Sequence, residues 1–191
     1  MNNVLGRVPS SWPLLRRPMR GFFDRAAPTW DERYASDPSR LMPLETALAL
    51  LPHPPARVLD VGTGTGAAAL VAAARWPEAD VLGIDVSPSM IELAAAKETR
   101  RGVRFLVADV AELEPGEGYD LVMMVNMPPF IAPVAALVRP GGYMAHIASR
   151  GPVTPFYTEP ARLDRGYRRH GLETVASGSA GPGTYYLAHR P

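Results

Sequence analysis

The sequence has no cysteine among its 191 residues. This absence excludes disulfide bonds, zinc held by cysteine and a thiol nucleophile. Of the 20 lysine and arginine residues, only Lys97 is a lysine. No Gly-Lys-Ser/Thr sequence of a P-loop is present, and Leu93 stands four positions before Lys97. The sequence therefore also lacks the Tyr-x-x-x-Lys pair that serves common hydride-transfer enzymes.

Long hydrophobic runs are missing as well. The longest apolar stretch, residues 121–138, is interrupted by Asn126 and by Pro128, Pro129 and Pro133. It is too short and too broken to cross a bilayer. The first 20 residues carry four arginines and no apolar core of a secretion signal. We therefore expect a cytoplasmic protein without a membrane partner.

Charge is balanced overall, at +1, but is unevenly distributed along the chain. Residues 1–25 carry five arginines against Asp24, whereas residues 59–120 carry eleven acids against five bases. The basic head is expected to be a solvated, loosely ordered arm; contact with a phosphate or a membrane surface is the alternative. An overall basic surface suited to nucleic acid is not indicated, so no nucleic-acid partner is expected.

Hydrophobic periodicity predicts strands that alternate with helices. Residues 1–27 are expected to be irregular because Pro9, Pro13, Pro18 and Gly21 interrupt them. Thr158 is expected to cap a helix that ends near Gly171. The expected strands are 57–61, 81–85, 103–108, 120–125, 142–149, 172–177 and 184–189. The other expected helices are 28–34, 40–51, the alanine-rich segment after Gly66, 88–101 and 131–138.

This alternation predicts an α/β fold with a doubly wound, mostly parallel, seven-stranded sheet. The last two strands have no helix between them, so a C-terminal strand should run antiparallel. The length suits one domain over residues 1–191. Within it we expect an N-terminal arm or lid with helices over 1–56, a cofactor-binding core over 57–149, and a C-terminal helix and hairpin over 150–191.

The sharpest motif is VLDVGTGTG at residues 58–66, where three glycines alternate between a strand and a helix. Glycine permits a tight turn and lets a ligand approach the backbone. The spacing of Gly62, Gly64 and Ala67 also fits the dinucleotide pattern G-x-G-x-x-G/A, and Asp85 suits the ribose of either kind of cofactor. Asp60, just before the first glycine, favours a cationic ligand over a pyrophosphate. An NAD(P)-binding oxidoreductase stays as an alternative.

The motif resembles motif I of class I S-adenosylmethionine-dependent methyltransferases. Residues 83–91 (GIDVSPSMI) and 105–110 (FLVADV) resemble their second and third motifs, and residues 119–122 and 138–142 resemble the fourth strand and the turn before the fifth. The resemblance runs in the family's order over residues 57–149. It implies the Rossmann-like methyltransferase fold and S-adenosyl-L-methionine as the cofactor.

The resemblance also implies the roles of individual residues. Glycines of the loop would pack under the methionine part of the cofactor, and Asp60 would hold its amino group. Asp85 would bind the ribose hydroxyls, Asp109 would accept from the adenine amino group, and Asn126 would face the methyl donor. The full predicted cofactor site is Asp60, Gly62, Thr63, Gly64, Gly66, Asp85, Val86, Met90, Asp109, Val110 and Asn126.

No residue pattern identifies a catalytic group, and the candidates are Asn126, His146 and Tyr157. The histidines have no metal-ligand spacing, so no metal site is expected. Asn126-Met127-Pro128-Pro129-Phe130 is similar to the Asn/Asp-Pro-Pro-Tyr/Phe segment of amide and nucleobase N-methyltransferases, but Met127 is an extra residue within it.

The sequence therefore predicts an enzyme that methylates a small-molecule acceptor by in-line displacement, in which proximity and orientation supply most of the rate. Two other functions stay open: a protein that binds S-adenosylmethionine without transferring the methyl group, and an amide or nucleobase N-methyltransferase. The predicted partners are the small-molecule acceptor and a second copy of the chain in a homodimer.

Overall fold

Seven strands form one mixed sheet in the order β3-β2-β1-β4-β5-β7-β6. The computed structural model describes residues 8–34, 37–97 and 102–191. Strands β1 to β5 run parallel, and β7 is antiparallel to both β5 and β6, which confirms the predicted sheet. The strands are β1 (Arg57–Val61), β2 (Asp80–Asp85), β3 (Val103–Val107), β4 (Tyr119–Val125), β5 (Val138–Ala148), β6 (Glu173–Ala180) and β7 (Gly183–His189).

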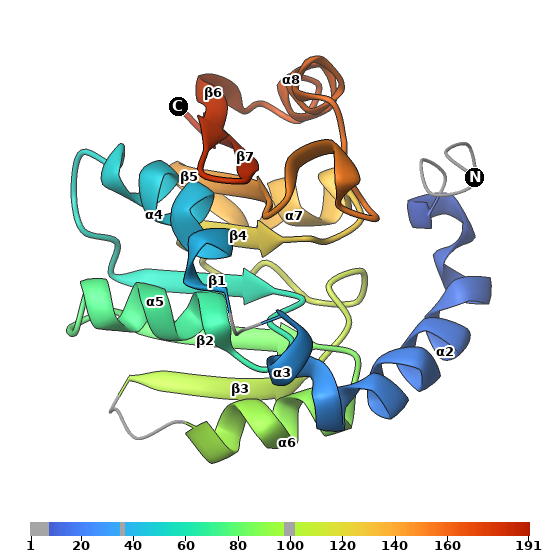
Figure 1. Cartoon of the computed structure of the whole chain (residues 1–191). Coiled ribbons are helices and arrows are strands. Elements are labelled where there is room, and N and C mark those ends of the chain that lie inside the picture. Colours follow the sequence, from blue (N-terminus) through green and yellow to red (C-terminus); the bar gives the residue numbers. More distant parts are fainter. Residues whose placement is uncertain (1–7, 35–36, 98–101) are drawn as a thin grey trace.

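Helices cover both faces of the sheet (Figure 1). One face carries α4 (Met42–Ala49), α5 (Ala67–Arg75) and α6 (Pro88–Lys97), and the other carries α7 (Ile131–Leu137) and α8 (Pro160–Arg168). The chain order reverses between β1 and β4, so connections on the two sides lead away from this point. In an open α/β sheet, such a switch point creates a crevice at the carboxyl ends of the strands.

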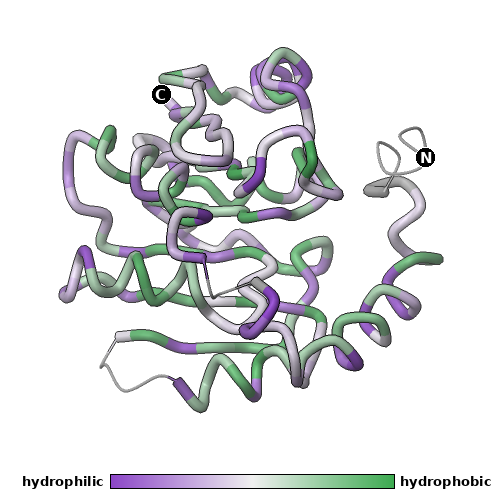
Figure 2. The backbone as a smooth tube through the Cα atoms, in the orientation of Figure 1, coloured by the Kyte–Doolittle hydropathy of each residue, from purple (hydrophilic) through white to green (hydrophobic). Residues whose placement is uncertain are grey.

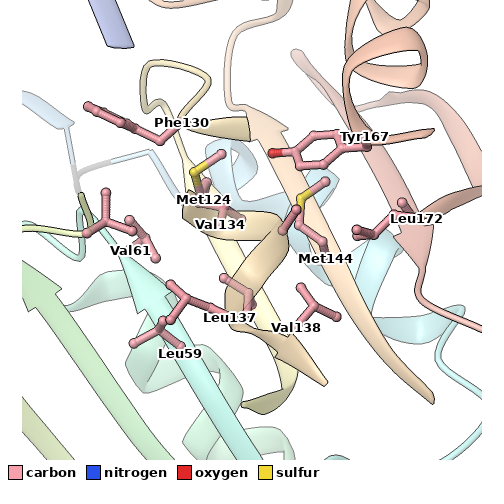
Figure 3. Packing of buried hydrophobic residues seen from close by; sticks show 14 of the residues in the cluster. Leu59, Val61, Met124, Phe130, Val134, Leu137, Val138, Met144, Tyr167 and Leu172 are labelled. Atoms are coloured by element: carbon pink, nitrogen blue, oxygen red, sulfur yellow. The ribbon is translucent and has the colours of Figure 1, made fainter. Parts of the chain in front are cut away.

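Two hydrophobic clusters bury the two faces. Figure 3 shows Leu59 and Val61 of β1 and Met124 of β4 in one cluster on the side of α7 and α8, which extends to Tyr167 of α8. The second cluster joins Leu44 to the alanines of α5 and to the opposite side of the same strands. Alternate residues of β1 and β4 thus enter opposite clusters, as the period of two in a strand requires. Burial on both faces explains why these strands read as continuous apolar runs.

The expectation of an irregular N-terminal arm is wrong for the described residues 8–26, which form the helix α2 (Val8–Ala26). Pro13 and Pro18 lie inside this helix, on its exposed side, although proline normally costs about 3 kcal/mol in a helix interior. Figure 2 shows hydrophobic and hydrophilic stretches alternating along it. Its inward side is held by tertiary contacts, described below, which outweigh the low helix propensity of the sequence. Residues 1–7 lie outside the described part of the chain.

Two 3-10 turns, each leading into a short helix, follow α2. A 3-10 turn (Ala27–Thr29) leads into α3 (Trp30–Tyr34), and a second one (Pro38–Leu41) leads into α4. The expected helices over 28–34 and 40–51 are therefore present in shortened form. In the second turn, the Asp37 carboxylate accepts hydrogen bonds from the Ser39 backbone N–H at 3.1 Å and from the Ser39 hydroxyl at 2.6 Å. A third 3-10 turn (Gly151–Val153) follows β5.

The expected N-cap at Thr158 is not formed. Helix α8 begins at Pro160 after Glu159, and the Thr158 hydroxyl lies 3.4 Å from the Phe156 carbonyl instead. Proline at the first helical position has the required backbone angle and no N–H to cap, which explains the later start. Within the described residues, none of the helices combines the length and hydrophobicity that crossing a bilayer requires.

His146 is buried in β5, and its Nδ1 has no hydrogen-bond partner in the part of the chain that the structure describes. Burial lowers the pKa of His146 from 6.5 to about 4. Between these values the unfolded chain binds the proton and the folded chain does not, so stability falls as pH falls through this range. The difference between these two pKa values corresponds to about 3 kcal/mol. We expect His146→Leu to reduce the stability loss between pH 7 and pH 4.

Urea unfolding of both proteins at pH 7, 5.5 and 4.5 measures this difference. The wild type should lose more free energy of unfolding than the variant on acidification. Parallel losses in the two proteins would show that His146 does not titrate in this way.

Candidate functional site

A cavity of about 590 Å³ opens at the carboxyl ends of the parallel strands. It lies at the switch point between β1 and β4, and its size is typical of a small-molecule site. The loops after β1, β2, β3, β4 and β5 all contribute to its wall, and α2 and α3 contribute aromatic side chains. Of the eleven residues predicted to bind a cofactor, ten line this cavity, and Gly66 is the exception.

The loop between β1 and α5 forms the floor of the cavity. Gly62, Gly64 and Gly66 have φ angles of 68°, 54° and 88°, in the left-handed region that side chains rarely adopt. A Cβ at Gly64 would have only Trp30 within 4 Å, at 3.8 Å, so the backbone is open to a ligand there. A Cβ at Gly66 would lie 2.9 Å from Phe105, so this glycine serves close packing against β3 and α6.

Asp60 is the penultimate residue of β1, beneath this loop, and is almost completely buried. Its Oδ2 accepts hydrogen bonds from the Thr63 hydroxyl at 2.7 Å and from the Ala69 N–H at 3.1 Å. Its Oδ1 is buried and has no partner among the described residues. Burial raises the pKa of Asp60 to about 6, although these two hydrogen bonds act in the opposite direction. A cationic group in the cavity would satisfy Oδ1 and restore the charged form.

Asp85 ends the neighbouring strand β2. Its Oδ2 accepts from the Gly64 N–H at 3.0 Å, and its Oδ1 accepts from the Ser87 N–H at 2.9 Å. Burial raises the pKa of Asp85, against the effect of these backbone donors. Each oxygen keeps one lone pair for a further donor, which a pair of hydroxyl groups could supply.

Asp109 follows β3 and is already in contact with α2. Its Oδ2 accepts from the Trp12 indole N–H at 2.7 Å and from Arg16 at 3.3 Å, while Oδ1 accepts from the Ala111 N–H at 3.0 Å. The Trp12 ring packs edge-on against Phe130 at 5.0 Å. Oδ1 retains one lone pair, so Asp109 can accept one further hydrogen bond beside Trp12.

Asn126 follows β4 and has a φ of 57°, which is rare for a residue with a side chain. Its side chain is tied to Ser149, which follows β5. Asn126 Nδ2 donates to Ser149 Oγ at 2.9 Å, and Ser149 N–H donates to Asn126 Oδ1 at 2.8 Å. Each polar atom of the amide therefore has one partner, while Nδ2 keeps a second N–H and Oδ1 a second lone pair. The adjacent Met127 lies over Gly62, where a Cβ would come within 2.1 Å of its sulfur.

The other two catalytic candidates lie outside the cavity lining. His146 sits in the core on the side of Met144, and Tyr157 places its hydroxyl 3.5 Å from Glu159. Burial, followed by the charge of Glu159, raises the pKa of Tyr157. Among residues 8–34, 37–97 and 102–191, His, Asp and Glu side chains form no group of three that could hold a metal ion.

Several lining residues were not predicted from the sequence. Asp31 of α3 accepts from the Thr65 hydroxyl at 2.6 Å and forms an ion pair with Lys97. The Ser149 position, directly after a parallel strand, could have been identified from the rule that ligands bind at strand carboxyl ends. The contact of Trp12 with Asp109 carries no such signal, because it depends on where α2 docks.

Residues 58–142, which include the glycine loop and the strands that line the cavity, match a family model described as "Methyltransferase domain". The malonyl-[acyl-carrier protein] O-methyltransferase of Laribacter hongkongensis is 42% identical over 84 residues, which make up 44% of this chain and 28% of that protein. The trans-aconitate 2-methyltransferase of Methylobacterium nodulans is 38% identical over 114 residues, which make up 56% and 43%. The chain thus matches less than half the length of either relative.

A solved structure extends the similarity to the whole fold. It is the Burkholderia thailandensis 1,6-didemethyltoxoflavin-N1-methyltransferase with bound 1,6-didemethyltoxoflavin and S-adenosylhomocysteine. The TM-score is 0.69 at 20% sequence identity, and the match covers 95% of this chain and 90% of that one. At this identity the similarity shows the fold alone.

Gly64 and Gly66 offer a matched test of the loop. Both adopt positive φ, so alanine costs about 1–2 kcal/mol of strain at either position. Only Gly66→Ala also forces its Cβ against Phe105 and Ala94. We expect Gly66→Ala to lower the free energy of unfolding clearly more than Gly64→Ala. Urea unfolding curves of the two variants decide this, and equal losses would contradict the packing role of Gly66.

Proposed function

We propose, because the chain belongs to the class I S-adenosylmethionine-dependent methyltransferase family, that it binds S-adenosyl-L-methionine and transfers the methyl group to a small-molecule acceptor. One observation carries the proposal. At the carboxyl ends of three neighbouring strands, Asp60 is the penultimate residue of β1, Asp85 is the last residue of β2 and Asp109 follows β3, and all three residues line one cavity. Their order in the sheet gives a row of hydrogen-bond acceptors long enough for an extended cationic nucleoside.

The residues present fit this cofactor. The orphaned Oδ1 of Asp60 would hold the amino group, and the open backbone at Gly64 would leave room beside it. The free lone pairs of Asp85 would take the ribose hydroxyls, and Oδ1 of Asp109 would take the adenine amino group. Met90, buried in α6, and Val86 and Val110 would supply apolar contacts. An unpaired buried acceptor is costly, so a ligand donor there is favourable.

The protein itself would contribute to methyl transfer by positioning the acceptor and by excluding water from the cavity. The cofactor supplies an electrophilic methyl group on a sulfonium. Asn126, fixed by Ser149, would form the wall between donor and acceptor, and Phe130 and the aromatic residues of α2 would exclude water. Holding the acceptor in line with the methyl group can account for several kcal/mol of the barrier.

An amide or nucleobase N-methyltransferase is the alternative. Such an enzyme would hold the acceptor with the Asn126 amide, which exchanges two hydrogen bonds with Ser149 and would have to use its second N–H and its second lone pair. Met127 fills the space over Gly62 in addition. A binding protein without transfer activity is distinguished from the enzyme by a labelled-methyl assay with metabolite pools.

S-adenosylhomocysteine should bind in the micromolar range, at about −8 kcal/mol. Asp85→Asn removes the charge-assisted bonds and sets an amide against backbone donors, so we expect a loss of about 1–3 kcal/mol. Asp80→Asn is the matched control, because Asp80 starts the same strand and pairs with Arg104 on the surface. Calorimetry measures both. A folded wild type that does not bind at millimolar concentration would overturn the methyltransferase assignment.

We also propose that α2 acts as a lid. It is tied to Asp109 by Trp12, and at its other end Asp24 accepts from the Ser87 hydroxyl at 2.6 Å and the Ser89 N–H at 3.4 Å. Trp12, Met19, Phe22 and Phe23 line the cavity, so a bound ligand would bury them further.

Hydrogen exchange over residues 8–26 tests the lid. We expect exchange to slow when S-adenosylhomocysteine binds, because the ligand fills the space that these aromatics border. Trp12→Ala should speed exchange in both states, whereas Leu14→Ala, at a side chain 82% exposed on the same helix, should not. Unchanged exchange on ligand binding would mean that α2 is a fixed wall.

A further inference from the structure

The cavity has a second half beyond the carboxylate row, at the ends of β4 and β5. Ser149 and Arg150 follow β5 there, and Arg40 reaches in from the turn before α4. The remaining wall on this side is largely apolar, with Leu41, Val153 and Phe156. This half is where an acceptor would meet the methyl group.

The polar side chains of this half present donors. Ser149 is buried, and its Oγ accepts from Asn126 Nδ2 at 2.9 Å and from Arg40 Nη2 at 3.5 Å. With both lone pairs engaged, the Ser149 hydroxyl has only its proton left to offer. Arg40 and Arg150 are donors as well, and they are permanently charged.

Arg40 and Arg150 both line this half of the cavity. Their positive charges lower the pKa of Asp37, after the larger effect of the hydrogen bonds from Ser39. Asp37 accepts two of these bonds on Oδ1, and Asp31, the next acid along this wall, is paired with Lys97. Apart from that ion pair, the described lining residues of this half hold two arginines against Asp37, which makes their formal charge positive.

The described acids of this wall, Asp31 and Asp37, are already engaged by Thr65 and Lys97 and by Ser39, which makes them poor bases for an acceptor. Of the titratable residues described along the cavity, the acids are Asp31, Asp37, Asp60, Asp85 and Asp109, and the bases are the two arginines. Asp60, Asp85 and Asp109 belong to the donor half. An alcohol or an ammonium acceptor would need to lose a proton, whereas a carboxylate is already a nucleophile at neutral pH.

We infer that the acceptor carries a carboxylate, held by Arg40, Arg150 and the Ser149 hydroxyl, and that the product is its methyl ester; this inference rests on the proposed methyl transfer. A carboxylate oxygen forms the new C–O bond to the methyl carbon as the C–S bond breaks. The bonding pair stays on sulfur, which becomes a neutral thioether, and no proton is released. The ester is uncharged, so it loses its attraction to both arginines and can leave.

The test uses octanoate and 4-phenylbutyrate beside their primary amides, with S-adenosylmethionine that carries a labelled methyl group. Transfer to the carboxylates should exceed transfer to the amides, and alkali should release the label as methanol, since esters hydrolyse in base. In parallel, the carboxylates should raise the melting temperature of the protein saturated with S-adenosylhomocysteine more than the amides do. An alkali-stable product, or carboxylates with no advantage over amides in both measurements, overturns the inference.

Arginine variants separate this inference from the proposed function. Arg40→Gln and Arg150→Gln should each raise KM for the carboxylate roughly tenfold or more, because each removes a charge-assisted bond. Their affinity for S-adenosylhomocysteine should stay within about twofold of the wild type. Arg165→Gln, at an exposed position of α8 outside the cavity, is the matched control. Unchanged KM in both variants overturns the inference, whereas a wild type that fails to bind S-adenosylhomocysteine overturns the proposed function itself.

Discussion

The carboxylate of Asp60 sets the shape of the loop on which the site is built. Its Oδ2 holds Thr63 on one side of the turn and the first turn of α5, at Ala69, on the other. With the loop so fixed, the Gly64 N–H meets Asp85 of the next strand. Two acids from neighbouring strands thus define one backbone segment. Burying a charge costs free energy unless it is fully paired, and Asp60 is paired on one oxygen only. The loop is therefore both well determined and incomplete without a cation.

The features of the fold that could be predicted from the sequence are those that short-range sequence patterns determine. The strand alternation, the antiparallel C-terminal strand and the glycine loop all depend on short-range periodicity or on backbone angles that only glycine adopts readily. Asp60, Asp85 and Asp109 could be placed because parallel strands bring their carboxyl ends to one edge. The sequence alone did not predict helix α2. Pro13 and Pro18 give a strong local signal against a helix. The contacts that override this signal are made by Trp12 and Asp24, with partners that lie 97 and 63 positions away in the sequence.

In the candidate site, too, local sequence patterns predicted some features, whereas others depend on tertiary contacts. His146 was a candidate because of its side chain, but only the tertiary structure shows that it lies in the core beside Met144 rather than along the cavity. Asn126 lines the cavity, and its bonds to Ser149 follow from β4 and β5 being neighbours in register. Charge shows a comparable pattern: the donor half of the cavity is lined by acids, and the acceptor half by arginines. This polarity arises from where the segments meet and is not visible in a net charge of +1.

The two halves of the cavity also come from different stretches of the chain. The donor half is built by consecutive elements from β1 to the loop after β4, within the segment that matches the family model. The acceptor half takes Arg40 from before that segment and Ser149 to Phe156 from after it. Substitutions in these flanking segments can change the lining of this half of the cavity while the loop at Asp60 is left intact. The flanks of the site can therefore vary in sequence around a constant centre.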